Sequence, residues 1–401
     1  MKIGIIKERK TPPDRRVVFT PEQLAELEKT YKDLHFIVEP SDIRIFSDEA
    51  YKKHGLKVDS DLSGCEVLLG VKEVPIEALI PNKSYFFFSH TIKKQSYNRD
   101  LLKAILDKNI ILYDHEVITG KKGNRLIGFG RYAGLVGTYN GFRLLGQRHQ
   151  SFDLPKVENL PDLKAVLKEL DQITIPHLKI LLTGFGKVAR GAKEILDHLK
   201  IKEVSVEDYL NKSFEVPVYT NANVMDYNKR KDGRAGDMYE FFKDPTPYES
   251  DFMKLAKVSD LFIAGHFYGD DAPYLFTREN AKHPDFNIKL VADISCDIDG
   301  PVASTIRPST IAEPFYAYDP QTESEVDALD KEAIGVMAVD NLPCELPKDA
   351  SEGFGEMFAK HVIPAFFNTD QDGVLERAQM TKNGQLTERY KYLQDFVDAK
   401  E

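Results

Sequence analysis

Residues 178–191 (LKILLTGFGKVARG) combine a short apolar run with closely spaced glycines and a helical pattern. Gly184 permits a tight strand-to-helix turn, and Gly186 has no Cβ to keep a pyrophosphate away from the backbone. A helix that begins with Lys187 and Val188 presents free N–H groups and a positive dipole end to phosphates. The spacing, with Ala189 in the third position, therefore favours a dinucleotide site over an ordinary glycine-bearing turn.

A second predicted strand, at residues 203–206, ends in Glu207. An acidic residue about 20 positions after the glycine turn is where a ribose hydroxyl is expected to bind. Glu207 would repel a 2′-phosphate and so favours NAD, although the sequence leaves the choice between NAD and NADP open.

Basic side chains follow two predicted strands in the first third of the chain. Lys72 comes after an apolar run at 65–71, and His90 after another at 85–89. Both types can move protons near neutral pH, although a surface lysine and a structural histidine are alternatives. Arg16 could bind a carboxylate through two hydrogen bonds, but taken alone an arginine here is expected to be solvated.

Acidic residues follow two predicted strands in the second half. Asp293 lies near the end of the predicted strand at 289–294 and is a candidate cofactor-binding residue. Asp340 follows the strand at 333–339 and is a candidate substrate-binding residue. Asp297 and Asp299 invite a calcium-loop interpretation, but the remaining ligands of such a loop are missing, so we predict no metal.

These residues need a scaffold of alternating strands and helices. We expect further strands at 2–6, 35–39, 110–113, 178–182 and 261–265, and helices that include 21–29, 98–108, 162–170 and 187–198. The alternation predicts the α/β class, with two Rossmann-like doubly wound domains and a cleft between them.

The order of the motifs predicts the domain division. Residues 1–131 with 345–401 are expected to form a catalytic domain, and 132–344 a dinucleotide-binding domain. The small residues at 128–137 are interpreted as close helix packing between the domains. No structure is predicted for the polar stretch 210–250.

Composition excludes several functions. The net charge of -10 argues against a general nucleic-acid partner. Three cysteines without paired spacing suit a reducing compartment, and no apolar run approaches the length of a membrane span. The chain starts directly with a strand pattern, so we expect no signal peptide and a cytoplasmic protein.

Several longer motifs resemble a known family. Residues 70–81 (GVKEVPIEALIP), 87–93 (FFSHTIK), 130–134 (GRYAG) and 383–393 (NGQLTERYKYL) are similar to the lysine–2-oxoglutarate reductases, the saccharopine-forming half of aminoadipic semialdehyde synthases. The wider family includes lysine-forming saccharopine dehydrogenase, alanine dehydrogenase and transhydrogenase.

The resemblance implies an oxidoreductase that condenses lysine with 2-oxoglutarate and reduces the imine with NAD(P)H to give saccharopine. It places Lys72 and His90 on the family's acid/base pair and Arg16 on its substrate-carboxylate arginine. An alanine dehydrogenase-like or other amino-acid dehydrogenase is the alternative enzyme, and a nucleotide-sensing protein without turnover is the alternative of another class. Whether the chain forms a homo-oligomer stays open.

Overall fold

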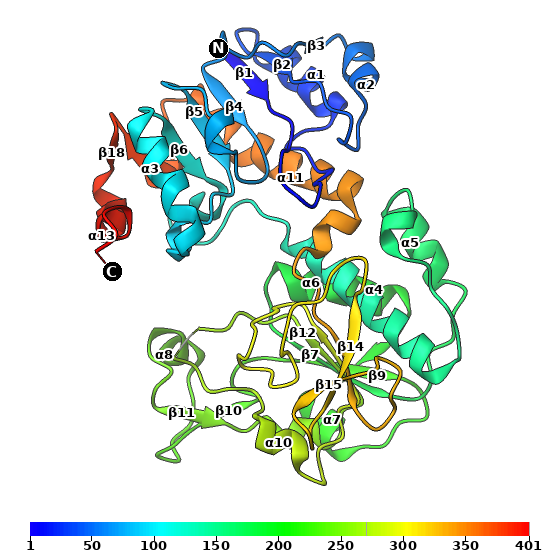
Figure 1. The fold of residues 1–401 in the computed structure, drawn as a ribbon. Coiled ribbons are helices and arrows are strands. Elements are labelled where there is room, and N and C mark those ends of the chain that lie inside the picture. Colours follow the sequence, from blue (N-terminus) through cyan, green and yellow to red (C-terminus); the bar gives the residue numbers. More distant parts are fainter. Residues whose placement is uncertain (270, 401) are drawn as a thin grey trace. The chain divides into compact units, whose positions relative to one another are not determined.

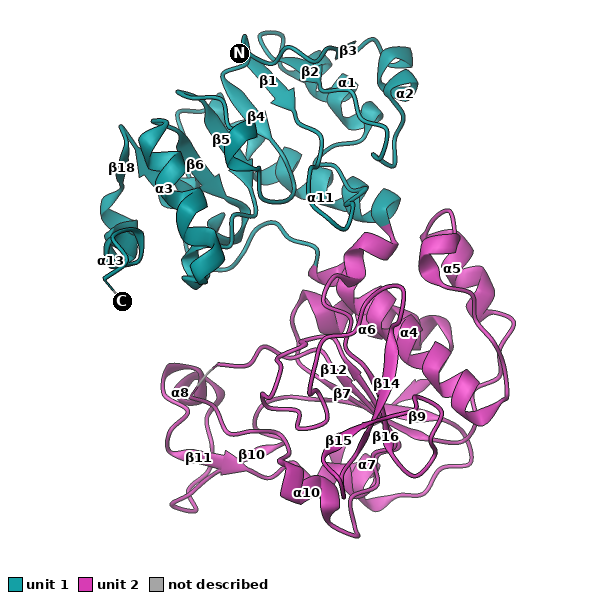
Figure 2. Cartoon of the chain, viewed as in Figure 1, with its two compact units in different colours: residues 1–129, 347–401 teal, residues 130–346 magenta. Residues whose placement is uncertain are grey.

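The computed structural model describes residues 1–269 and 271–400 and divides the chain into two compact units. Unit 1 comprises residues 1–129 and 347–401, and unit 2 comprises residues 130–346 (Figure 2). The sequence placed the division after residue 131 and before residue 345. Within the described residues, no helix is long and apolar enough to cross a membrane.

Unit 1 is built on a parallel sheet in the order β3-β2-β1-β4-β5-β6. Its strands are β1 (Lys2–Ile5), β2 (His35–Val38), β3 (Lys57–Val58), β4 (Val67–Leu69), β5 (Ser84–Phe87) and β6 (Ile111–Asp114). The order reverses direction at β1, whose neighbours are β2 and β4. In open α/β sheets, ligands bind beyond the carboxyl ends of the strands at such a switch point.

Helices cover both faces of this sheet (Figure 1). They are α1 (Pro21–Thr30), α2 (Asp48–Lys53), α3 (Arg99–Asp107), α11 (Pro347–His361), α12 (Val374–Ala378) and α13 (Gln394–Val397), with a small hairpin of β17 (Thr381–Lys382) and β18 (Gln385–Leu386). The capping box at Thr20 confirms the predicted start of α1.

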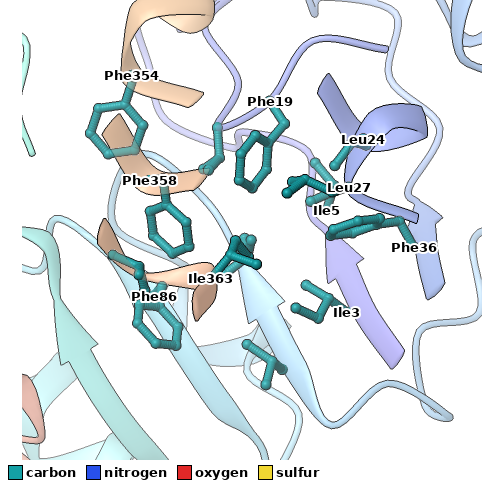
Figure 3. Close-up of a cluster of buried hydrophobic side chains, with 14 of the residues drawn as sticks. Ile3, Ile5, Phe19, Leu24, Leu27, Phe36, Phe86, Phe354, Phe358 and Ile363 are labelled. Atoms are coloured by element: carbon teal, nitrogen blue, oxygen red, sulfur yellow. The ribbon is translucent and has the colours of Figure 1, made fainter. Parts of the chain in front are cut away.

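The C-terminal segment completes the core of unit 1. Phe354 and Phe358 of α11 pack with Ile5 of β1 and Phe86 of β5 (Figure 3). On the opposite face, residues of α3 and α13 pack against Leu68 and Tyr85. Each face of the sheet is therefore buried, which explains why its strands read as continuous apolar runs.

Unit 2 contains a larger, mostly parallel sheet in the order β15-β14-β16-β13-β12-β7-β9-β8. Its strands are β7 (Lys179–Thr183), β8 (Lys202–Glu203), β9 (Val218–Ala222), β12 (Leu261–Ala264), β13 (Leu290–Asp293), β14 (Phe315–Asp319), β15 (Ser324–Val326) and β16 (Ile334–Met337). Its helices are α4 (Gly130–His149), α5 (Leu163–Leu170), α6 (Lys187–His198), α7 (Val206–Asn211), α8 (Met238–Lys243), α9 (Met253–Ala256) and α10 (Arg278–Lys282).

The stretch 210–250, for which the sequence predicted no structure, supplies β9, the strand between β7 and the edge strand β8. β9 pairs with β7 in parallel along its whole length, while β8 lies beyond β9 at the sheet edge. The remainder of the stretch contains α8 and a hairpin of β10 (Asn228–Arg230) and β11 (Tyr248–Ser250). The predicted strand at 203–206 is shorter than expected, and α7 begins where that strand was expected to end.

The small residues at the start of α4 pack within unit 2, which corrects their interpretation as packing between domains. A Cβ on Gly134 would lie 1.9 Å from the carbonyl oxygen of Val188, and one on Gly191 would lie 2.0 Å from that of Arg131. The backbones of α4 and α6 therefore approach too closely for any larger side chain. This contact fixes the helix that follows the glycine turn.

Candidate active site

Lys72 and His90 both lie at the carboxyl ends of neighbouring strands in the sheet of unit 1. β4 and β5 are parallel neighbours, and the pairing continues past them because the amide of Phe88 donates to the carbonyl of Val71 at 2.9 Å. Both basic residues are partly buried. The structure thus places the two candidate proton carriers beyond the carboxyl ends of neighbouring strands, where open α/β sheets bind ligands.

His90 has a carboxylate partner that the sequence did not identify. Its Nδ1 lies 2.5 Å from Oε1 of Glu73, and Lys10 Nζ lies 3.0 Å from the other oxygen. Burial acts to raise the pKa of Glu73, but the bonds with His90 and Lys10 outweigh it and lower the value to about 2. A charged Glu73 orients the imidazole and leaves Nε2 for a substrate.

A second carboxylate shapes the backbone around His90. Asp114, fully buried at the end of β6, accepts hydrogen bonds from the amide of Ser89 at 3.0 Å and from its hydroxyl. Ser89 Oγ in turn lies 2.8 Å from Thr91 Oγ1. His90 itself has a left-handed backbone with φ 54°. These hydrogen bonds fix Ser89 and Thr91, the residues on either side of His90, and so maintain its strained backbone conformation.

Arg16 is buried rather than solvated, so that part of the sequence interpretation is wrong. Only 3% of Arg16 is exposed, and its guanidinium donates to both oxygens of Asp14, at 3.0 and 2.6 Å. It also lies 4.2 Å above the ring centroid of Phe129. Burial opposes ionisation of Asp14, but Arg16, with a smaller contribution from Lys72, lowers its pKa to about 2.

Glu8 is a component of this site that the sequence reasoning missed. Its two carboxylate oxygens accept the amides of Val71 and Lys72 at 2.7 and 2.8 Å. Burial raises the pKa of Glu8 to about 7, against the effect of these bonds. Glu8 follows β1 as Lys72 follows β4, so the rule that polar residues at strand ends converge could have found it.

The Asp14–Arg16 pair predicts a pH-dependent loss of stability. Because the pKa of Asp14 is lower in the folded state, its contribution is present above pH ~4 and is lost as the pH falls through about 2. We expect Asp14→Asn to reduce the free energy of unfolding by about 2–3 kcal/mol at pH 7, a difference that disappears towards pH 2. Denaturant unfolding from pH 7 to pH 2 measures this, with the exposed Asp107→Asn as the matched control. A deficit that persists unchanged at pH 2 would contradict the assignment.

The glycine turn of unit 2 has the geometry that a phosphate site requires. Gly184 has φ 93°, and a Cβ there would lie 2.5 Å from the carbonyl oxygen of Gly265. A Cβ on Gly186 would meet no described residue within 4 Å. Gly186 is the N-cap of α6 and has no side chain, so it makes no side-chain cap hydrogen bond to the first turn, which begins with Lys187 and Val188. Ala189 is buried against Gly265, where a small side chain lets α6 pack closely on the end of β12.

Glu207 does not lie at the end of a strand next to the glycine turn, the position from which a contact with the ribose was predicted. It lies on the exposed surface of the first turn of α7, beyond β8, and β9 separates β8 from β7. The amide of Gly184 instead donates to the carbonyl of Ala222, the last residue of β9, at 3.3 Å. Asn223 therefore comes directly after the β9 residue that is hydrogen-bonded to the glycine turn.

The other two acidic candidates have different environments. Asp293 is fully buried, and its carboxylate accepts hydrogen bonds from Ser295, Cys296 and Thr305, so it organises the loop after β13. Its role in cofactor binding stays a prediction. Asp340 is exposed after β16, in unit 2, whereas Arg16 belongs to unit 1.

Comparison with known proteins defines the class of fold. Residues 4–136 match the family model for the alanine dehydrogenase/PNT N-terminal domain. An L-alanine dehydrogenase structure matches the chain with a TM-score of 0.67 and 17% identity, covering 99% of each chain. The chain therefore has the fold of the Rossmann-type dehydrogenases.

Proteins of similar sequence indicate which dehydrogenases the chain is related to. The chain is 29% identical over 441 residues to the mitochondrial alpha-aminoadipic semialdehyde synthase of Mus musculus, covering 97% of this chain and 47% of the relative. It is 24% identical over 385 residues to the saccharopine dehydrogenase (NAD(+), L-lysine-forming) of Candida glabrata, covering 90% and 93%. The chain is thus a homologue of the aminoadipic semialdehyde synthases and saccharopine dehydrogenases, and it spans about half the length of the former.

Proposed function

We propose that the chain is an oxidoreductase that forms or cleaves saccharopine. The reaction joins L-lysine and 2-oxoglutarate with NAD(P)H to give saccharopine, NAD(P)+ and water. The observation that carries the proposal is the convergence of Lys72 and His90 at one sheet edge. The buried Asp14–Arg16 pair is electrostatically coupled to Lys72. These residues belong to a chain whose relatives bear the names of enzymes of this chemistry.

The residues of unit 1 suit the proton transfers of this reaction. The ε-amine of lysine must lose a proton before it attacks the ketone, and the resulting carbinolamine needs a proton donor so that water can leave. His90 can accept or donate at Nε2 while Glu73 holds Nδ1. Lys72 supplies a second group for this exchange, and the fixed charge of Arg16 suits a substrate carboxylate.

The residues of unit 2 fit a nicotinamide dinucleotide. The open space at Gly186 and its position as the N-cap of α6 suit a pyrophosphate. When bound, the reduced cofactor supplies the hydride that converts the imine into an amine. We propose that unit 2 provides this binding and unit 1 the acid/base groups.

An oxidation assay with paired substrates tests the proposal. We expect oxidation of NADH or NADPH only when L-lysine and 2-oxoglutarate are both present, with saccharopine as the product identified by mass spectrometry. Pyruvate with ammonium is the matched alternative, because an alanine dehydrogenase would use that pair. Nucleotide binding without turnover of any pair would instead indicate a sensing protein.

We further propose that Asn223, and not Glu207, faces the 2′ position of the adenosine ribose. The amide of Asn223 donates to Asp226 at 2.7 Å, and its side-chain oxygen accepts from Met225 at 2.7 Å, so the backbone beyond β9 turns next to the glycine turn. A neutral residue here repels a 2′-phosphate less than an acidic one does.

This proposal predicts opposite outcomes for two variants. We expect Asn223→Asp to shift the ratio of kcat/KM for NADPH and NADH at least tenfold towards NADH, about 1.4 kcal/mol. Glu207→Ala, two strands away from the turn, should leave the ratio unchanged. Steady-state kinetics with both cofactors decides between them, and a shift caused by Glu207→Ala alone would restore the original assignment.

A further inference from the structure

The backbone that carries Lys72 continues beyond the end of β4 and is bonded on both sides. On the side of β5, the amide of Gly70 and the carbonyl of Val71 extend the ladder past Leu69, the last residue of β4. On the side of β1, the amide of Ile6 donates to the carbonyl of Leu69 at 3.0 Å. The next amides along this edge belong to Val71 and Lys72, and they lie beyond the end of β1. Backbone amides that leave a ladder in a partly buried place need other acceptors.

The side chain of Glu8 supplies these acceptors. Its Oε1 accepts the amide of Val71 at 2.7 Å, and its Oε2 accepts the amide of Lys72 at 2.8 Å. Each oxygen of one carboxylate therefore holds one of two consecutive amides, and bonds to a charged acceptor are stronger than bonds to a neutral one. Because Glu8 comes shortly after β1, the two bonds tie the backbone of Lys72 to the strand at which the order of the sheet reverses.

His115 holds the same segment at its first residue. Its Nε2 lies 2.9 Å from the carbonyl oxygen of Gly70, and because a carbonyl only accepts, Nε2 carries the proton. The ring is fully buried, with its centroid 5.0 Å from that of Phe88 and 5.1 Å from that of Phe354. Burial lowers the pKa of His115 to about 3, so the ring is neutral at pH 7 and adds no charge near Lys72. The surrounding rings fix the imidazole, and the imidazole fixes Gly70.

We propose that Glu8 positions Lys72 for the acid/base chemistry by fixing its backbone, with His115 as a second support. This inference rests on the proposed role of Lys72 in forming or cleaving saccharopine and adds the groups that orient it. Glu8 and His115 are positioning residues, because they act through the segment 70–72 and need no contact with substrate. Lys72 interacts electrostatically with Asp14, so its side chain has a defined charged neighbour to reach. A displacement of about 1 Å in such a group can lower a rate about 10²-fold.

Hydrogen exchange in Glu8→Gln tests the two bonds without any substrate. The variant keeps one oxygen but turns an NH₂ group towards the second amide, so one amide loses its acceptor. Burial raises the pKa of Glu8 to about 7, so the exchange is followed at about pH 8.5, where the wild type carries the carboxylate. We expect the amide of Val71 or Lys72 to exchange about tenfold faster while the amides of β4 keep their rates. The exposed Glu77→Gln is the matched control. Unchanged exchange at both amides in the folded variant would overturn the proposal.

Kinetics distinguish positioning from a role in stability alone. We expect Glu8→Gln to lower kcat about tenfold or more, with little change in the KM of L-lysine and 2-oxoglutarate or in the Kd of NADH. In the Lys72→Met background the same substitution should cause no further loss, because Glu8 acts through Lys72. Single-turnover measurements with enzyme in excess give access to the low rates of that background. An unchanged kcat in Glu8→Gln, or an equal loss when Lys72 is absent, would overturn the proposal.

A pair of variants at His115 keeps the proposal testable if Glu8→Gln does not fold. His115→Gln places its side-chain nitrogen where Nε2 was and can still donate to Gly70, whereas His115→Leu cannot. We expect kcat in His115→Leu to be about tenfold below that in His115→Gln, and only while Lys72 is present. Equal kcat values in the two folded variants would overturn the support by His115. A failed saccharopine assay combined with faster exchange in Glu8→Gln would reject the proposed reaction and leave the bonds of Glu8 to the Lys72 backbone standing.

Discussion

Lys72→Met and His90→Gln are each expected to lower kcat by roughly 10² to 10⁴, the loss typical of a missing proton-transfer group. The physical reason is their shared position beyond the carboxyl ends of β4 and β5, from which, in the proposed reaction, both would act on the same substrate. Nucleotide affinity should change little, because the glycine turn belongs to unit 2. Steady-state turnover and nucleotide titration measure the two effects separately.

The combination of the two substitutions adds a further check. Groups that act as a unit are not additive, so the double variant should lose less than the product of the single losses. Two ionisations are expected in the wild-type pH profile, and each single variant should remove one of them. The exposed residues Lys103 and His54 provide matched controls as Lys103→Met and His54→Gln. Wild-type rates in both Lys72→Met and His90→Gln would make the pair structural.

Gly186→Val is expected to weaken nucleotide binding at least tenfold, about 1.4 kcal/mol in binding free energy. The added side chain enters space that no described residue fills, so the fold should tolerate it while the pyrophosphate is kept from the backbone. Gly64→Val is the matched control, since a Cβ there also meets no described residue within 4 Å. Calorimetric titration with NADH and NADPH gives both affinities. Unchanged affinity in a folded Gly186→Val protein would move the phosphate site elsewhere.

Much of the fold could be predicted from local sequence patterns. The buried strands of both sheets are short apolar runs, and the predicted helix at 187–198 has the observed bounds of α6. The strand β9 was missed because it lies within a polar stretch and contains Tyr219, Thr220 and Asn221. Pairing between β9 and β7 is a long-range contact, which the order of strands along the chain does not reveal. The expected position of Glu207 beside the glycine turn was argued without this strand, which separates β8 from β7.

In the candidate site, too, residues next to a strand could be predicted from the sequence, whereas contacts between distant residues could not. Lys72 and His90 stand directly after their strands, so a strand pattern was enough to select them. The burial of Arg16 could not be predicted from neighbouring residues alone. Its partner Asp14 is close in the sequence, but the ring of Phe129, which its guanidinium covers, is more than a hundred residues away. Glu73 was equally hidden, since its bond to His90 joins two different strand ends. The expected cleft between the two domains stays a prediction.

Transfer of deuterium tests the central claim most directly. The enzyme is incubated with L-lysine, 2-oxoglutarate and reduced nicotinamide cofactor deuterated at C4, using each of the two stereospecifically labelled forms. If an imine is reduced, one form should yield saccharopine that carries a single deuterium on the α-carbon derived from 2-oxoglutarate, and the other form should yield unlabelled saccharopine. Cofactor oxidation without label in saccharopine, or label found only in another amino acid, would contradict the proposed reaction.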